Sequence, residues 1–297
     1  MLTRTILSVP ANSPKMLLNA DYMGADIILF DLEDSVPPDQ KSFARELLRT
    51  YLSQNLTHCT AMVRVNDVKT PFFLQDLEAV LPLSIIGIML PKMEEPADIA
   101  YADAQMTAVE QRCALPPEAR RVIIGTIETA LGVENAYACL SSSSRVIGCS
   151  FGSEDFAVSM GVSRSADNME LEYARRRVVI AAKAAGKIAV DTVFTNVHDD
   201  AGLRAMTEEG KQLGYDGKFI ISPRQVPVVH EVYTPSPKEI AHALAVTEKM
   251  KESMENGTGV AVLNGKMLDK PVLQQAQHIL DLARSAGVSL EKEASHE

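Results

Sequence analysis

The chain has 297 residues, with 29 Lys and Arg against 39 Asp and Glu, which gives a formal net charge of −10. This acidic balance, without any run of basic residues, argues against nucleic-acid binding, because contacts to phosphate backbones need clustered Lys and Arg. The hydrophobic share of 46% is that of an ordinary globular protein, and no apolar stretch approaches the ~20 residues that span a bilayer, so we expect neither a nucleic-acid partner nor a membrane partner.

Eight runs of aliphatic and β-branched residues, bounded by turn residues, predict β-strands. Most of these runs, such as ADIILFDL and VIIGTIET, are nearly continuous in apolar residues rather than alternating. Such runs are typical of strands that are buried on both faces of a parallel sheet. The predicted strands cover residues 5–9, 26–32, 61–66, 87–91, 122–128, 145–151, 188–194 and 218–222.

Helical segments separate these strands along the chain. The first has Ser13 as a natural N-cap and Pro14 at the first helical position. The alternation of strand and helix predicts βα units, and eight of them fit a closed (β/α)8 barrel better than an open sheet, since no GxGxxG follows the first strand. The predicted helices cover residues 14–23, 39–54, 71–81, 96–113, 131–140, 168–185 and 199–213.

The chain changes character after residue 222. A proline-rich stretch leads to a long predicted helix at 237–255, a glycine-containing segment, and a last predicted helix at 271–286. We therefore predict two parts, a (β/α)8 TIM-barrel catalytic domain at residues 1–230 and a C-terminal helical arm and lid at residues 231–297.

The expected location is the cytoplasm. The first residues are too polar, and are interrupted too early by Pro10, to form a signal peptide. Four cysteines, Cys59, Cys113, Cys139 and Cys149, form no CxxC pair. Widely spaced cysteines of this kind are typical of free thiols in a reducing compartment.

Polar residues follow several of the predicted strands, at the end of a barrel where chemistry is concentrated. Arg64 ends the third strand, Glu128 ends the fifth, and Asp155 comes shortly after the sixth. Two carboxylates, with no His or Cys beside them, suit a hard cation such as Mg²⁺ rather than zinc. The guanidinium of Arg64 could hold a substrate carboxylate through two hydrogen bonds.

Acidic residues crowd the end of the second predicted strand, at Asp31, Glu33 and Asp34. Alternate residues of a strand share a face, so only one of the two sets can face the barrel axis. We expect Glu33 or Asp34 to lie behind the site and to pair with Arg4 or Arg64. Charged residues at strand ends also form structural ion pairs that orient loops, and for each of these residues that alternative stays open.

Several motifs run in the same order as in a known family, from about residue 4 to residue 286. They include RTILSVPANSPKML, GADIILFDLEDSVPPDQKSFAR, VRVND, IGTIETALGVENA, FGSEDF, LGYDGKFIISPRQ and GVAVLNGKMLDKP. On these motifs the chain resembles the citrate lyase β-subunit family within the HpcH/HpaI aldolase and citrate lyase superfamily. That family includes citryl-, malyl- and citramalyl-CoA lyases.

The resemblance implies an oligomeric barrel, a trimer or hexamer, that uses Mg²⁺ to cleave a 3-hydroxyacyl-CoA into acetyl-CoA and a 2-oxo acid. It implies that Arg64 binds the oxo-acid carboxylate and assists catalysis, and that Glu128 and Asp155 bind Mg²⁺, with Glu128 also facing the substrate. Asp269, in the GKMLD segment of the lid, would be a catalytic group that acts in the site of a neighbouring subunit.

Three other interpretations stay open. The chain could be the β subunit of a citrate lyase complex that cleaves citryl on an acyl carrier protein, a malyl-CoA thioester hydrolase, or a non-catalytic binding protein on a barrel scaffold. The chain also departs from the family motifs, with Ser222 where several members have His and Ala11 where many have Gly. These departures leave the acyl group of the substrate open.

Overall fold

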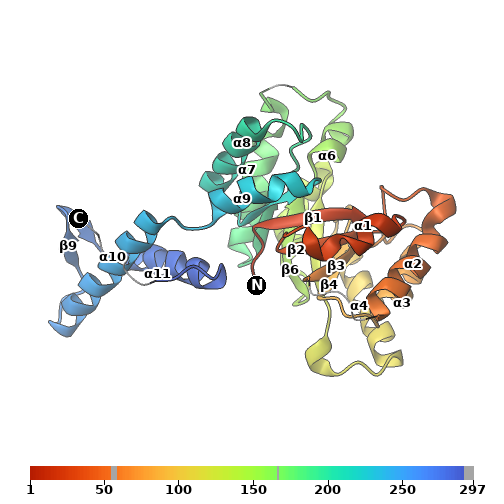
Figure 1. Cartoon of the computed structure of the whole chain (residues 1–297), viewed down its shortest axis with the longest axis horizontal. Helices are drawn as coiled ribbons and strands as arrows, with labels where there is room; N and C mark the ends of the chain where they lie inside the picture. Colours follow the sequence, from red (N-terminus) through yellow and green to blue (C-terminus); the bar gives the residue numbers. More distant parts are fainter. Residues whose placement is uncertain (55–58, 166, 291–297) are drawn as a thin grey trace. The chain divides into compact units, whose positions relative to one another are not determined.

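Eight parallel strands form a closed barrel in the computed structural model, which describes residues 1–54, 59–165 and 167–290 (Figure 1). Each strand pairs with the next in the chain, and β8 returns to pair with β1. The predicted (β/α)8 barrel is thus confirmed. The strands are β1 Thr5–Pro10, β2 Ile27–Asp31, β3 Ala61–Arg64, β4 Gly87–Leu90, β5 Val122–Ile127, β6 Val146–Phe151, β7 Ile188–Asp191 and β8 Gly217–Ile220.

Helices follow the strands and surround the barrel (Figure 1). Two of them, α6 and α9, were not predicted: α6 has eight residues, too few for a clear apolar period, and α9 contains Pro227, which a first helical turn tolerates. The helices that begin in the barrel unit are α1 Pro14–Leu18, α2 Lys41–Ser53, α3 Phe73–Val80, α4 Pro96–Arg112, α5 Ala130–Ser141, α6 Ser153–Met160, α7 Glu172–Ala184, α8 Asp200–Leu213 and α9 Val226–Tyr233.

The lower part of the barrel interior is apolar and closely filled. One cluster of fully buried side chains combines residues from six strands, and Phe219 of β8 packs against it. In β2 the two members, Ile27 and Leu29, are alternate residues, as expected for one face of a strand. The cluster consists of Ile6, Ile27, Leu29, Met62, Met89, Ile124 and Val190.

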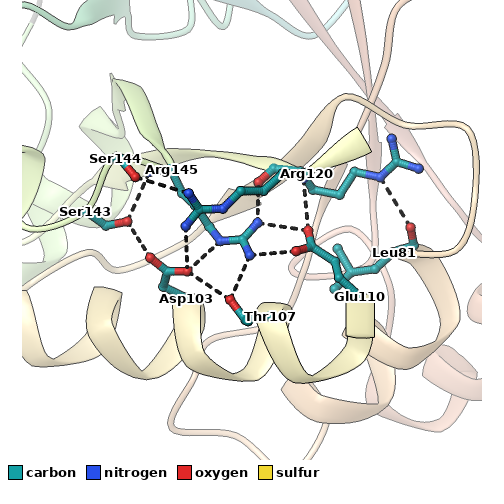
Figure 2. A network of polar contacts seen from close by, with 9 residues as sticks. Leu81, Asp103, Thr107, Glu110, Arg120, Ser143, Ser144 and Arg145 are labelled. Atoms are coloured by element: carbon teal, nitrogen blue, oxygen red, sulfur yellow. Dashed lines mark hydrogen bonds and ion pairs between the residues drawn. The ribbon is translucent and has the colours of Figure 1, made fainter. Parts of the chain in front are cut away.

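A buried ion-pair network ties α4 to the amino-terminal end of the barrel (Figure 2). Arg145 precedes β6, and its guanidinium lies 2.6 Å from Glu110 and 2.5 Å from Asp103, both on α4. Thr107 accepts a further hydrogen bond from Arg145, and Ser143 donates one to Asp103. The Arg145 side chain is 1% exposed, so the network fixes the fold at the end opposite to the strand termini that the sequence analysis singled out.

The C-terminal part, from Glu231 onward together with Met1 and Leu2, is a second compact unit. It contains α10 Pro237–Glu255, α11 Lys270–Ser285 and an antiparallel hairpin of β9 Ala261–Leu263 and β10 Lys266–Leu268. The two helices were predicted, whereas the hairpin was not. The core of this second unit consists of buried residues from α10, β10 and α11, namely Ile240, Ala243, Val246, Met250, Leu268, Ala276, Leu280 and Ala283. None of the described helices combines the length and apolar character that crossing a bilayer requires.

Candidate functional site

A cavity of about 420 Å³ lies at the carboxyl ends of the barrel strands. Its polar lining continues the interior face of the strands, because side chains two residues apart point the same way. Thus Leu29 is followed on that face by Asp31, and Met62 by Arg64. The cavity is lined by Ser8, Asp31, Asp34, Ser35, Arg64, Thr126, Glu128, Ser150, Phe151, Gly152, Ser153, Glu154, Asp155, Thr192, Val193, Phe219 and Ile221.

Arg64 forms a bidentate ion pair with Asp31. Its Nε and Nη2 donate to the two carboxylate oxygens of Asp31 at 2.7 and 2.6 Å. Burial alone would raise the pKa of Asp31, but the hydrogen bonds and charge of Arg64 lower it. Burial likewise disfavours the charged form of Arg64, but the hydrogen bonds and charge of Asp31 outweigh burial and raise the pKa of the guanidinium. Both groups are therefore charged, and a substrate carboxylate would have to use the remaining N–H groups of Arg64.

Glu33 and Asp34 lie on the other side of the same guanidinium. Arg64 Nη1 is 3.2 Å from Glu33 Oε2 and 3.9 Å from Asp34 Oδ2. Burial raises the pKa of Glu33 to about 7 against the opposing charge of Arg64, with Asp34 and Asp31 adding to the rise. Oε2 of Glu33 is buried and accepts no hydrogen bond from the described residues, so its contact with Arg64 is an ion pair alone. One buried carboxyl oxygen beside Arg64 therefore accepts no hydrogen bond from the described residues.

A lysine fixes the loop that carries these acidic residues. Lys41, at the start of α2, donates from Nζ to the carbonyl oxygens of Leu32 and Glu33, both at 2.7 Å. Asn66 also donates to the carbonyl of Leu32, at 3.0 Å. Because Lys41 is buried under the loop, it positions the backbone next to Arg64.

Glu128 follows β5 and is 3% exposed. Its Oε1 accepts a hydrogen bond of 2.8 Å from the backbone N–H of Lys92. Burial raises the pKa of Glu128 to about 8; Glu33 and Asp155 add to the rise, and the Lys92 N–H opposes it. Gly152 leaves room for this carboxylate, since a Cβ built there would lie 2.7 Å from Glu128 Oε2.

Asp155 lies in the first turn of α6, directly after the end of β6. The partial positive charge at a helix N-terminus favours a carboxylate at this position. Its neighbour Glu154 is paired with Arg164, whereas no donor among the described residues bonds to the side chain of Asp155. A half-buried carboxylate without a protein partner therefore lines the cavity next to Glu128.

The donor set of the cavity fits a hard divalent cation. Carboxylates of Glu128 and Asp155 and hydroxyls of Thr126 and Ser150 line it, and no His or Cys among the described residues does. The described residues contain no group of three or more His, Cys, Asp or Glu side chains arranged to hold a metal. Mg²⁺ does not need one, because it keeps several waters and binds through one or two carboxylates.

Arg64, Glu128 and Asp155 are thus brought together, and three other predicted residues, Glu33, Arg4 and Asp269, are not part of the cavity lining; Glu33 lies behind Arg64. Arg4 precedes β1 and pairs with Asp26 at 2.7 Å, at the amino-terminal end of the strands. Asp269 belongs to the C-terminal unit, where it is the N-cap of α11 and accepts a hydrogen bond from the backbone of Val272 at 3.2 Å.

Sequence reasoning did not identify the contributions of Lys92 and Gly152. Their parts in the site come from a backbone N–H and from a missing Cβ, neither of which is a feature of residue chemistry. The glycine directly after a predicted strand and before two acidic residues was the available signal for Gly152.

Known proteins share this chain's sequence over most of its length. A family model described as HpcH/HpaI aldolase/citrate lyase matches residues 4–223. The citrate lyase subunit beta of Leuconostoc mesenteroides subsp. cremoris is 40% identical over 286 residues, which cover 96% of this chain and 94% of that protein. The mitochondrial citramalyl-CoA lyase of Homo sapiens is 34% identical over 294 residues, which cover 95% and 86% of the two chains.

A solved structure agrees with the fold. The crystal structure of CitE from Mycobacterium tuberculosis in complex with magnesium, acetoacetate and coenzyme A has a TM-score of 0.77 with this chain. The two are 30% identical, and the match covers 95% of this chain and 98% of the other. On its sequence and its barrel, the chain belongs to the HpcH/HpaI aldolase/citrate lyase family and is an enzyme of the oxo-acid lyase type.

Proposed function

We propose that this enzyme is a Mg²⁺-dependent carbon–carbon lyase that splits a 3-hydroxyacyl-CoA of the citramalyl, malyl or citryl type into acetyl-CoA and a 2-oxo acid. The observation that carries the proposal is one cavity that combines the ion-paired Arg64 with Glu128 and Asp155. The relatives named as a citrate lyase subunit and a citramalyl-CoA lyase, and the magnesium and coenzyme A in the related structure, support it.

Arg64 is assigned to the carboxylate of the oxo-acid part. Asp31 occupies its Nε–Nη2 edge, which keeps the guanidinium in one orientation and charged. The remaining N–H groups can donate to a second carboxylate, and charge-assisted bonds of this kind give both affinity and orientation. Arg64 therefore orients the C–C bond that breaks and supports the negative charge that develops beside it.

Glu128 and Asp155 would hold the metal ion. Bound there, Mg²⁺ supplies Lewis-acid stabilisation to the substrate oxygens. Glu128 must be ionised for this role, and its burial opposes ionisation. The N–H of Lys92 favours the ionised form of Glu128, and the helix terminus of α6 favours the carboxylate of Asp155.

Asp269 is assigned to proton transfer at the acetyl carbon, in the active site of a neighbouring copy within a trimer or hexamer. Mixed oligomers of Asp269→Ala and Arg64→Ala subunits test this assignment. Some sites in such hybrids combine an intact barrel with an intact lid, so we expect activity to return. Hybrids that form and stay inactive would contradict the shared site.

The reaction is tested with purified protein and Mg²⁺ on citryl-, malyl- and citramalyl-CoA, with detection of the oxo acid and acetyl-CoA. We expect oxo-acid release from one of the three, lost in Asp155→Asn, which has the same size but no charge. Retention of near wild-type cleavage by Asp155→Asn would refute the metal assignment. Free CoA with an intact hydroxy acid would instead identify a thioester hydrolase.

A second candidate is the β subunit of a citrate lyase complex. It is favoured by the 40% identity with the Leuconostoc citrate lyase subunit beta over nearly the full length of both chains. In that case the substrate is a citryl group carried by an acyl carrier protein. Cleavage of the citryl carrier protein at a much higher kcat/KM than citryl-CoA would favour this candidate.

A further inference from the structure

The backbone of Lys92 adopts a left-handed conformation, with a φ of 49°, two residues after β4 ends. Residues with a Cβ rarely adopt this backbone conformation, because the Cβ approaches the following carbonyl oxygen. The other described residues with a positive φ that are not glycine are Ala114, Asn168 and Asn264, and asparagine tolerates the region comparatively well. Lys92 therefore has a strained backbone conformation, and its side chain does not favour that conformation as an asparagine side chain would.

The neighbouring residues are built around this turn. Met93 donates its backbone N–H to the carbonyl of Thr126 on β5, at 3.0 Å. A Cβ at Gly125 would lie 2.3 Å from the Met93 sulfur, and a Cβ at Gly132 would lie 2.7 Å from the Met93 carbonyl oxygen. Two positions without a side chain thus make room for the residue that follows Lys92.

The left-handed turn directs one N–H at Glu128. The amide of Lys92 donates to Oε1 at 2.8 Å, and the amide of Met93 donates to the strand that carries Glu128. The Lys92 ammonium, by contrast, has no carboxylate within ion-pair distance in the part of the chain that the structure describes. The backbone of Lys92, rather than its side chain, makes the defined contact with the site.

We infer that Lys92 is a positioning residue for Glu128, whose left-handed backbone aims an N–H at Oε1 and leaves Oε2 for a divalent cation. The identity of that cation rests on the proposed function. Groups that orient a metal ligand from behind typically contribute 10- to 100-fold to metal affinity. The same size of effect is expected here from any change that moves the amide away.

Four proteins separate the backbone from the ammonium: the wild type, Lys92→Gly, Lys92→Asn and Lys92→Val. Glycine and asparagine accept the left-handed conformation, whereas the β-branched valine resists it. Binding of Mn²⁺ is measured by electron paramagnetic resonance, independently of any substrate. We expect Lys92→Val to bind Mn²⁺ about 10-fold or more weakly, and Lys92→Gly and Lys92→Asn to bind it as tightly as the wild type or more tightly.

The opposite results overturn the inference. Wild-type affinity in Lys92→Val would show that the turn is irrelevant to the metal, and a loss in Lys92→Gly equal to that in Lys92→Val would assign the effect to the side chain. Tighter Mn²⁺ binding in all three variants would also overturn the inference. It would show that only the loss of the ammonium matters, because a cation near Glu128 and Asp155 opposes a second one.

A second measurement does not depend on the folding of the valine variant. Hydrogen exchange at the amide of residue 92 reports on its bond to Glu128. We expect slow exchange in the metal-free wild type and at least about 10-fold faster exchange in Glu128→Ala, since an exposed amide loses its protection. Equal exchange in the two proteins would overturn the inference. A wild type that binds no Mn²⁺ but protects this amide would refute the metal assignment of the proposed function and leave the hydrogen bond to Glu128 supported.

Discussion

Replacement of Gly152 by alanine tests the most tightly confined part of the site. The added methyl group would lie 2.7 Å from both Cβ and Oε2 of Glu128, and 3.3 Å from Cγ2 of Thr126. Glu128 itself has little freedom to move, because its other oxygen is bonded to the Lys92 amide and its side chain is buried. The alanine variant must therefore displace the carboxylate, shift the start of α6, or both.

The size of the effect follows from these distances. Contacts of 2.7 Å between heavy atoms that are not hydrogen bonded are well inside van der Waals distance, and one added methyl group in a packed region typically costs about 1–3 kcal/mol of stability. A displaced metal ligand has a larger effect on function. We expect Mg²⁺ affinity to fall roughly 10- to 100-fold, as it does when the orientation of a ligand is lost.

The assay pairs Gly152→Ala with Gly259→Ala. A Cβ at Gly259 meets no atom within 4 Å, so the control adds the same methyl group without a clash. Urea unfolding and Mn²⁺ titration are measured for both variants and for the wild type. If Gly152→Ala binds Mn²⁺ as tightly as Gly259→Ala does, the reasoning that Gly152 makes room for the Glu128 carboxylate is refuted.

Three other predictions concern charge. Arg64→Lys cannot form both bonds to Asp31, and we expect kcat/KM for the lyase reaction to fall by about 100-fold or more; a loss below about 10-fold in that rate assay would contradict the fixed orientation of Arg64. Burial raises the pKa of Glu128 from 4.5 to about 8, so the folded metal-free protein keeps a proton that the unfolded chain releases. Its stability should therefore fall between about pH 5 and pH 8 by up to a few kcal/mol, and urea unfolding of Glu128→Gln should lose much of this slope. Arg145→Met leaves the buried carboxylate of Glu110 without its ion-pair partner and should cost about 3–5 kcal/mol in urea unfolding. The control Arg112→Met removes an arginine that is 58% exposed and pairs with Glu78, and it should cost less than about 1 kcal/mol. Equal losses in the two variants would show that the buried network contributes no more to stability than an exposed ion pair.

The barrel was predictable because each strand is an apolar run with a turn on either side. The nearly continuous apolar run at residues 26–32, for example, indicates a strand buried on both faces, and β2 indeed lies between β1 and β3. The predicted strand ends were one to three residues too long in several cases. For example, Glu128 was predicted to lie in a strand that ends at Ile127, because apolar spacing does not show where the sheet ladder stops.

The site was predictable only in its residue types. Arg64, Glu128 and Asp155 could be chosen because carboxyl ends of barrel strands meet at one rim. The ion pair between Arg64 and Asp31, the hydrogen bond from the Lys92 amide and the close approach of Glu128 to Gly152 could not be predicted, because each depends on a register or a backbone angle. The helix α6, whose first turn contains Asp155, was missed because eight residues are too few for a clear apolar period.

The apolar layer beneath the cavity has a kinetic consequence. Ile27, Met62 and Ile124 are fully buried below the polar rim, so the interior is blocked and molecules enter and leave by one opening. If the proposed cleavage takes place in this cavity, both products must leave through the opening by which the substrate entered, and a product that stays bound delays the next turnover.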